Sequence, residues 1–279
     1  MSKTTIQISE ELRKKLKVLA SQRDLSYEKL LEELVDMSFS RVESGKTCVI
    51  LAGGDPKKLY ISSLKTYRPL VNIGRKMLIE DILLKCKGVG FDGIVIVGFS
   101  KMLAELQKVI GEGEKYGVKI NYVEEKKEMG SAKTLELAKK YLKNDFLFLP
   151  CDHWFDFDLK KLQDFHLSQN GTVTLGIHTR TSFDWSKGVV VLDGSKITDF
   201  EESPKNPKTH LTSVFTGFMK MEIFNYIPPG NVFCSLQDDV FPKLAAEGKL
   251  IGYPVPGNWV NVHSKEDIEK INSIKEKSK

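Results

Sequence analysis

The chain has 279 residues, 41% of them hydrophobic, with 42 Lys and Arg against 37 Asp and Glu and a formal net charge of +5. This length and composition predict a protein with a substantial core, and the mild positive charge favours anionic ligands without identifying one. No stretch approaches the ~20 apolar residues of a membrane span or contains a signal peptide, so we expect a cytoplasmic protein with no membrane contact. Four scattered cysteines match no metal-ligand spacing and predict reduced thiols.

The first 40 residues predict a separate small domain. Residues 3–8 alternate with period two, which is typical of a short strand with one polar face. Ser9 is a suitable N-cap for a helix ending near residue 24, and Ser26 is one for a second helix directly after it. The polar residues 41–46 are predicted to be a linker to the body, residues 47–279.

A strand and two helices of this size bury little apolar surface alone, and an unpaired edge strand favours pairing with a second copy. The order resembles the ribbon-helix-helix family, whose two chains pair their strands into a ribbon that enters the DNA major groove. The resemblance implies a homodimer or higher oligomer, with Lys3, Thr5 and Gln7 facing base edges and the helix start at Ser26 facing a phosphate. Residues 1–46 hold nine basic and eight acidic side chains, a net +1, which is little for a DNA-binding domain. The alternative is a dimerisation clip without DNA contact.

The body alternates apolar strands with helical stretches, which predicts a parallel sheet with helical crossovers. The predicted strands cover residues 48–52, 93–97, 119–122, 146–149, 172–178, 188–192 and 214–221, and the predicted helices residues 76–87, 102–110 and 132–142. Fewer helices separate the later strands, which indicates an added antiparallel portion covering a pocket. We therefore expect an α/β fold with a mixed sheet.

Residues 48–80 combine a buried strand, a glycine turn, a long basic loop and an amphipathic helix, an order that places backbone amides at the end of a parallel strand. This segment resembles the opening signature of the sugar-nucleotidyltransferase (nucleotide-sugar pyrophosphorylase) family. The matching residues are Leu51, Ala52, Gly53, Gly54, Leu59, Pro69 and Leu70. The resemblance implies a Rossmann-like, GT-A-like fold that binds a nucleotide along this turn.

Several positions depart from the family signature. Pro56 stands for its third glycine, Lys57 for its threonine, Lys58 for its arginine, Tyr67 for its proline and Arg68 for its lysine. Lys58 and Arg68 keep positive charge and are the expected catalytic cations, with Lys57 as a further nucleotide contact. Pro56 lacks an N–H where the family uses flexible backbone around the triphosphate.

The resemblance continues along the body. Gly130-Ser131 stands where the family has a turn against the base and ribose, and Glu202 and Gly217 stand where it contacts the sugar. Asp152 matches an aspartate that holds magnesium, although a strand-end aspartate also caps turns.

Two further positions bear on the metal. Asn261 replaces the family's second magnesium carboxylate, and Ser203 replaces the lysine that meets the sugar phosphate. The resemblance therefore implies an Mg²⁺ site at Asp152 and Asn261 that is weak or absent. His153 adjoins this site, but a lone histidine is more often packed or solvated than a ligand.

The accumulated departures favour a pseudoenzyme: a ribbon-helix-helix regulator of transcription whose body binds a nucleotide, sugar phosphate or nucleotide-sugar with weak or no catalysis. An active sugar-1-phosphate nucleotidyltransferase, dimerised by its N-terminal head, is the alternative. A structural role with an empty pocket is the third reading.

Overall fold

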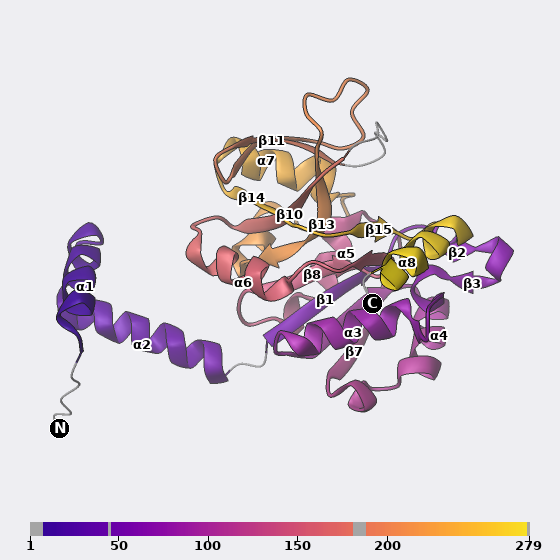
Figure 1. Ribbon diagram of the computed structural model, residues 1–279, viewed down its shortest axis with the longest axis horizontal. Helices are drawn as coiled ribbons and strands as arrows, with labels where there is room; N and C mark the ends of the chain where they lie inside the picture. The colour runs from indigo at the N-terminus through magenta and orange to yellow at the C-terminus, as the bar shows by residue number, and fades with distance from the viewer. Residues whose placement is uncertain (1–7, 44–45, 181–187, 278–279) are drawn as a thin grey trace. The chain divides into compact units, whose positions relative to one another are not determined.

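A computed structural model describes residues 8–43, 46–180 and 188–277 (Figure 1). Two compact units make up the chain, residues 1–45 and residues 46–279. We call them the head and the body.

The described part of the head is a pair of helices, α1 (Glu10–Gln22) and α2 (Tyr27–Glu43). Ser9 Oγ accepts the Leu12 N–H at 3.2 Å, and Ser26 Oγ accepts the Lys29 N–H at 3.2 Å. Both serines are therefore N-caps, as predicted. Residues 41–43, predicted as part of the linker, are the last residues of α2, and the linker itself stays a prediction. The predicted strand residues Lys3, Thr5 and Gln7 lie outside the described residues.

The head has a very small core of its own. Among its described side chains, only Ala20 and Leu30 are buried hydrophobics, whereas Leu12, Val18 and Val35 are 45%, 58% and 46% exposed. So little burial gives two helices little stability.

Deleting residues 1–45 is expected to leave the body folded, with its melting temperature unchanged, because the body carries both large cores of the chain. Circular dichroism of the truncated protein measures this. A truncated body that melts without cooperativity would show that the head supports it.

A nine-stranded mixed sheet forms the centre of the body, in the order β10-β14-β12-β11-β13-β8-β1-β6-β7. Its strands are β1 (Lys46–Ala52), β6 (Phe91–Gly98), β7 (Lys119–Glu124), β8 (Phe146–Pro150), β10 (Val173–Thr179), β11 (Val189–Asp193), β12 (Lys196–Glu201), β13 (Leu211–Met219) and β14 (Leu250–Pro254). Strands β8, β1, β6 and β7 are parallel, whereas β13 runs antiparallel to β8. The predicted α/β fold with an added antiparallel portion is confirmed.

Two short hairpins and a two-stranded ladder accompany the central sheet. They are β2 (Tyr60–Ile61) with β3 (Thr66–Tyr67), β4 (Asn72–Ile73) with β5 (Lys76–Met77), and β9 (His153–Phe155) with β15 (Trp259–Asn261). The predicted helix at residues 76–87 begins later, at Leu78, because residues 76 and 77 pair in β5.

Helices cover both faces of the sheet (Figure 1). One hydrophobic core contains residues of α3 (Leu78–Gly88), α4 (Ser100–Ile110), α6 (Leu159–Ser168) and α8 (Lys265–Lys277). The other contains residues of α5 (Ser131–Leu137) and α7 (Phe241–Ala246). Strand β1 contributes Cys48 and Ile50 to the first core and Val49 and Leu51 to the second, as its period of two requires. None of the described helices is both long and apolar enough to cross a membrane.

Candidate functional site

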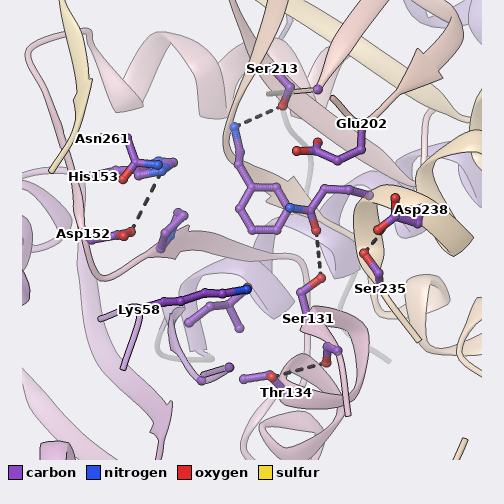
Figure 2. A pocket seen from close by; sticks show the side chains of 18 of the residues that line it. Lys58, Ser131, Thr134, Asp152, His153, Glu202, Ser213, Ser235, Asp238 and Asn261 are labelled. Atoms are coloured by element: carbon purple, nitrogen blue, oxygen red, sulfur yellow. Dashed lines mark hydrogen bonds and ion pairs between the residues drawn. The ribbon is translucent and has the colours of Figure 1, made fainter. Parts of the chain in front are cut away.

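A cavity of about 490 Å³ lies at the carboxyl ends of β1 and β8 (Figure 2). This is the edge of an open α/β sheet where ligands bind. The predicted site residues that line it are Leu51, Gly53, Gly54, Lys58, Gly130, Ser131, Asp152, Glu202 and Asn261. Residues from both halves of the body therefore meet around one space.

The glycine turn after β1 is held by a buried carboxylate. Gly54 has φ of 95°, and its N–H donates to Glu125 Oε2 at 2.8 Å. The Thr134 hydroxyl donates to the other oxygen, Oε1, at 2.6 Å. A Cβ on Gly53 would overlap Glu125 and lie 2.7 Å from Thr134 Cγ2, so only glycine fits at that position.

Sequence reasoning missed Glu125, which is 7% exposed. It follows β7 within the acidic and basic run 124–128, where nothing local distinguishes a buried carboxylate from a solvated one. Successive side chains of a strand point to opposite faces, so the exposed Glu124 at the end of β7 suggests that Glu125 points inward. This is the only sequence signal that could have identified Glu125 as buried.

Replacing Glu125 with Gln is expected to lower the free energy of unfolding by about 1–3 kcal/mol, because an amide cannot accept both hydrogen bonds and leaves a buried group unpaired. Urea unfolding of the variant measures the change. Glu124→Gln, at an exposed neighbouring position, is the control and should stay within about 0.5 kcal/mol of the native protein. Equal stability for the two variants would contradict the role of Glu125 in holding the glycine turn.

Two predicted nucleotide contacts lie away from the cavity. Ala52 is 1% exposed and packs inside the sheet. The Lys57 side chain is exposed, and its backbone N–H donates to Asp55 Oδ1 at 2.9 Å, which closes a turn. Neither residue lines the cavity, and their nucleotide contacts stay predictions, whereas the neighbouring Lys58 extends into the cavity (Figure 2).

Asp152 follows β8 and forms a buried ion pair with Arg68. Arg68 Nη1 lies 2.8 Å from Asp152 Oδ2, with the two side chains 13% and 10% exposed. Burial raises the pKa of the adjacent Cys151 thiol well above its usual value, helped by the Asp152 charge, so Cys151 stays protonated. Arg68 itself does not line the cavity but lies beyond Asp152. The structure therefore brings together the predicted catalytic residues Lys58, Arg68 and Asp152, with only Lys58 and Asp152 facing the space.

Asn261 lies beside Asp152 because β15 pairs with β9, which places Asn261 opposite His153 (Figure 2). No described residue hydrogen-bonds the buried Asn261 Oδ1. His153 is 4% exposed, its Nδ1 lies 3.0 Å from the Val214 carbonyl, and the Trp259 indole N–H donates to that same nitrogen at 3.2 Å. His153 is thus packed in the wall.

These residues do not fit a resident divalent cation. The described residues contain no group of three or more His, Cys, Asp or Glu side chains placed to hold a metal. One oxygen of Asp152 is already paired with a guanidinium, and Asn261 supplies a neutral oxygen where a carboxylate would help hold a dication. The predicted pair of metal ligands is adjacent in space, but the Arg68 guanidinium cancels the single negative charge that the pair carries.

The turn at Gly130 and Ser131 forms another wall. Gly130 has φ of 91°, and the Ala132 N–H donates to the Cys234 carbonyl at 3.1 Å. The Ser131 hydroxyl donates to Gln237 Oε1 at 2.8 Å and accepts the Leu236 N–H at 2.8 Å. This network fixes the turn against residues 234–237. Gly130 and Ser131 therefore form a rigid surface of the cavity, and the Ser131 hydroxyl is already hydrogen-bonded within the protein.

A third wall comes from β13 and its neighbours. The pairing of β10 with β13 shifts so that residues 214–216 lie opposite a single residue, and Phe215 in this bulge has φ of 48°. Such a conformation is strained for an aromatic residue and frequent near functional sites. Phe215 and Ser213 line the cavity with Glu202. Gly217 does not, because it pairs with Leu175 inside the sheet, where a Cβ would overlap the Thr174 carbonyl.

Further lining residues escaped the sequence prediction: Thr134 and Phe215 lie in the predicted helix 132–142 and strand 214–221 but were not assigned to the site, and most of the others belong to elements that the prediction did not place. These lining residues include Glu128, Thr134, Phe200, Ser213, Phe215, Phe233, Ser235, Gln237 and Asp238. The π-helical turn at Leu236–Val240 brings Gln237 and Asp238 to the cavity, and a π-turn carries no sequence signature of its own.

Comparison with known proteins agrees with this geometry. A family model described as Nucleotidyl transferase matches residues 47–278. The chain is 28% identical over 229 residues to mannose-1-phosphate guanyltransferase 2 of Candida glabrata, covering 79% of this chain and 62% of that protein. It is 28% identical over 254 residues to glucose-1-phosphate adenylyltransferase of Clostridium beijerinckii, covering 80% of this chain and 64% of the relative. The chain thus spans less than two thirds of the length of these relatives.

A crystal structure from Bacillus anthracis, provisionally assigned as a glucose-1-phosphate thymidylyltransferase, superposes with a TM-score of 0.74 at 21% identity. The match covers 83% of this chain and 95% of that one. At this identity the likeness shows the shared fold.

These findings overturn the interpretation as a DNA-binding regulator of transcription with weak or no catalysis. The relatives named above are sugar-1-phosphate nucleotidyltransferases, and the family match covers nearly the whole body. The substitutions in the loop after β1 and at Ser203 and Asn261 were given too much weight against a resemblance that runs along more than 200 residues. The chain belongs to the nucleotidyl transferase family.

Proposed function

We propose that the body catalyses nucleotidyl transfer, in which a sugar 1-phosphate and a nucleoside triphosphate give a nucleotide-sugar and pyrophosphate. The observation that carries the proposal is the cavity at the ends of β1 and β8, which the glycine turn, Lys58, Asp152 and Glu202 all line. The family match over residues 47–278 supports the same reaction class.

In this reaction a phosphate oxygen of the sugar 1-phosphate attacks the α-phosphorus of the triphosphate. The new P–O bond forms while the bond from the α-phosphorus to the bridging oxygen breaks, and pyrophosphate leaves. No covalent enzyme intermediate is needed, so the protein contributes positioning and charge neutralisation.

The walls of the cavity suit different parts of the substrates. Lys58 is the phosphate-facing cation, and the turn at Gly53 and Gly54 lets backbone approach the triphosphate closely. Gly130 and Ser131 give a rigid surface for the base and ribose, and Glu202 is placed to accept a sugar hydroxyl. Asp152 lines the cavity together with Lys58 and forms an ion pair with the Arg68 guanidinium.

The head is proposed to dimerise the enzyme, in a ribbon-helix-helix arrangement that stays a prediction. The exposed apolar side chains of α1 and α2, with only two buried ones among its described residues, support a need for a second copy. A cytoplasmic location also stays a prediction.

A forward assay tests the function. The native protein is incubated with each of the common nucleoside triphosphates and a panel of hexose 1-phosphates, both with Mg²⁺ and with EDTA, and nucleotide-sugars are detected by mass spectrometry. We expect one preferred pair to give product at about 1 per second or faster. No product from any pair would contradict the proposal.

A further inference from the structure

The side of the cavity around Ser131 differs in charge from the side around Lys58. We call the lining residues of segments 128–131 and 235–238 the Ser131 wall; they are Glu128, Gly130, Ser131, Ser235, Gln237 and Asp238. Glu128 and Asp238 are exposed carboxylates, and none of these six described residues carries a positive charge. Lys58 and Asp238 lie on opposite sides of the cavity (Figure 2). Because two negative charges repel phosphate, the Ser131 wall suits the uncharged part of a nucleotide, its base.

The backbone that carries Gln237 is held firmly. The preceding residue, Leu236, is fully buried. Ser235 Oγ accepts the Asp238 N–H at 3.2 Å, and the Ser235 N–H donates to Asp239 Oδ2 at 2.7 Å. The π-helical turn therefore presents Gln237 to the cavity from a fixed position.

The Ser131 hydroxyl sets the orientation of the Gln237 amide (Figure 2). A backbone N–H can only donate, so the Leu236 N–H, 2.8 Å from Ser131 Oγ, uses one lone pair of the hydroxyl. The hydroxyl proton then goes to Gln237 Oε1 at 2.8 Å. With the amide turned over, that proton would have no acceptor among the described residues. None of the residues that the structure describes accepts the two N–H groups of Gln237 Nε2, which are left for a ligand.

A donor in a fixed position distinguishes nucleobases by the group at one ring carbon. Guanine carries a carbonyl oxygen at C6, and thymine and uracil carry one at C4, whereas adenine and cytosine carry an amino group there. A carbonyl accepts a hydrogen bond from Gln237 Nε2, but an amino group is itself a donor and would leave both groups unpaired. The carboxylate of the next residue, Asp238, offers an acceptor for the ring N–H beside such a carbonyl.

We propose that Gln237, oriented by Ser131, determines the base specificity of the cavity. The substrate is then a nucleotide with a carbonyl group at C6 of a purine or C4 of a pyrimidine, rather than an adenine or cytosine nucleotide. The inference rests on the proposed function, because it names the class of nucleotide that the same cavity takes.

Calorimetric titration of the native full chain with two matched pairs of triphosphates tests the proposal. Inosine and adenosine triphosphate differ in having a carbonyl or an amino group at C6, and uridine and cytidine triphosphate differ in the same way at C4. In the pair that binds more tightly, we expect the carbonyl-bearing member to bind at least about tenfold tighter than its partner. An amino-bearing member that binds as tightly as its partner in that pair would overturn the proposal.

Removing the donor should remove the preference. Gln237→Met keeps a side chain of similar length without an N–H group, so the ratio of the two affinities should fall to about one. Gln107→Met, at an exposed position of α4, is the matched control and should keep the native ratio. A folded Gln237→Met protein with the native ratio would overturn the role of Gln237.

Two further variants separate this role from a structural one, because each is expected to improve the binding of the amino-bearing base. Gln237→Glu replaces the donors with an acceptor and should reverse the ratio. Ser131→Ala leaves Gln237 in place but frees its amide to turn over, which should lower the ratio by about threefold or more. Native ratios in both folded variants would overturn the proposed orientation of Gln237 by Ser131.

Failure of the inference and failure of the function give different results. A protein that makes nucleotide-sugar from an adenine or cytosine nucleotide as well as from its carbonyl-bearing counterpart keeps the proposed function and refutes the role of Gln237. A protein that prefers the carbonyl-bearing triphosphate but makes no nucleotide-sugar supports the role of Gln237 and refutes the function. Absence of binding by all four triphosphates would refute both.

Discussion

Replacing Asp152 with alanine is expected to lower the free energy of unfolding by about 3–5 kcal/mol and to abolish turnover. The loss arises because Arg68, 13% exposed, would keep its charge in the protein interior without a partner. Equilibrium unfolding in urea measures the stability, and the forward assay measures turnover.

Asp164→Ala is the matched control, since Asp164 is 58% exposed and pairs with Lys160 on the surface. Surface pairs of this kind contribute about 0–1 kcal/mol, so the control should differ little from the native protein. Replacing both partners, as Arg68→Met with Asp152→Leu, should restore much of the stability while turnover stays absent. Equal destabilisation by Asp152→Ala and Asp164→Ala would contradict the buried pair.

Replacing Gly130 with alanine is expected to lower the free energy of unfolding by about 2–5 kcal/mol, the sum of a left-handed backbone and an overpacked contact. Gly130 has φ of 91°, and its added Cβ would overlap the Cys234 carbonyl and lie 3.1 Å from the Ser235 nitrogen. Both neighbours are backbone atoms and cannot rotate away. The same change should reduce turnover, because it displaces the wall proposed to face the base.

Gly248→Ala separates the two contributions. Gly248 also has positive φ, 66°, but its Cβ would meet nothing within 4 Å. This control should therefore lose only about 1–2 kcal/mol, the cost of the backbone conformation. Urea unfolding of both variants gives the comparison, and equal losses would show that Cys234 does not constrain Gly130.

The sequence predicted those elements of the fold that depend only on residues close together in the chain. Strand β1, its glycine turn and the carboxylate after β8 each have a sequence signature, and β1 and β8 are neighbours in the sheet. Both helix caps of the head were also predictable, because Ser9 and Ser26 act on residues three positions away.

The interactions that decide the chemistry are long-range and carry no local signature. Arg68 and Asp152 are 84 residues apart in the chain, and Gly54 and Glu125 are 71 apart. From sequence alone, Arg68 was expected to be a catalytic cation, and only the structure shows that it pairs with Asp152 and does not line the cavity. The family resemblance placed Gly217 beside the sugar, but the register of β13 pairs it with Leu175 of β10.

The reverse reaction tests the central claim most directly. Native protein is incubated with radiolabelled pyrophosphate and a panel of nucleotide-sugars, with Mg²⁺ and with EDTA in parallel, and nucleoside triphosphates are separated and counted. We predict label in one nucleoside triphosphate for the native protein, and none for a folded Asp152→Asn variant. Absence of labelled triphosphate with every nucleotide-sugar, or equal labelling by the native and Asp152→Asn proteins, would contradict nucleotidyl transfer in this cavity.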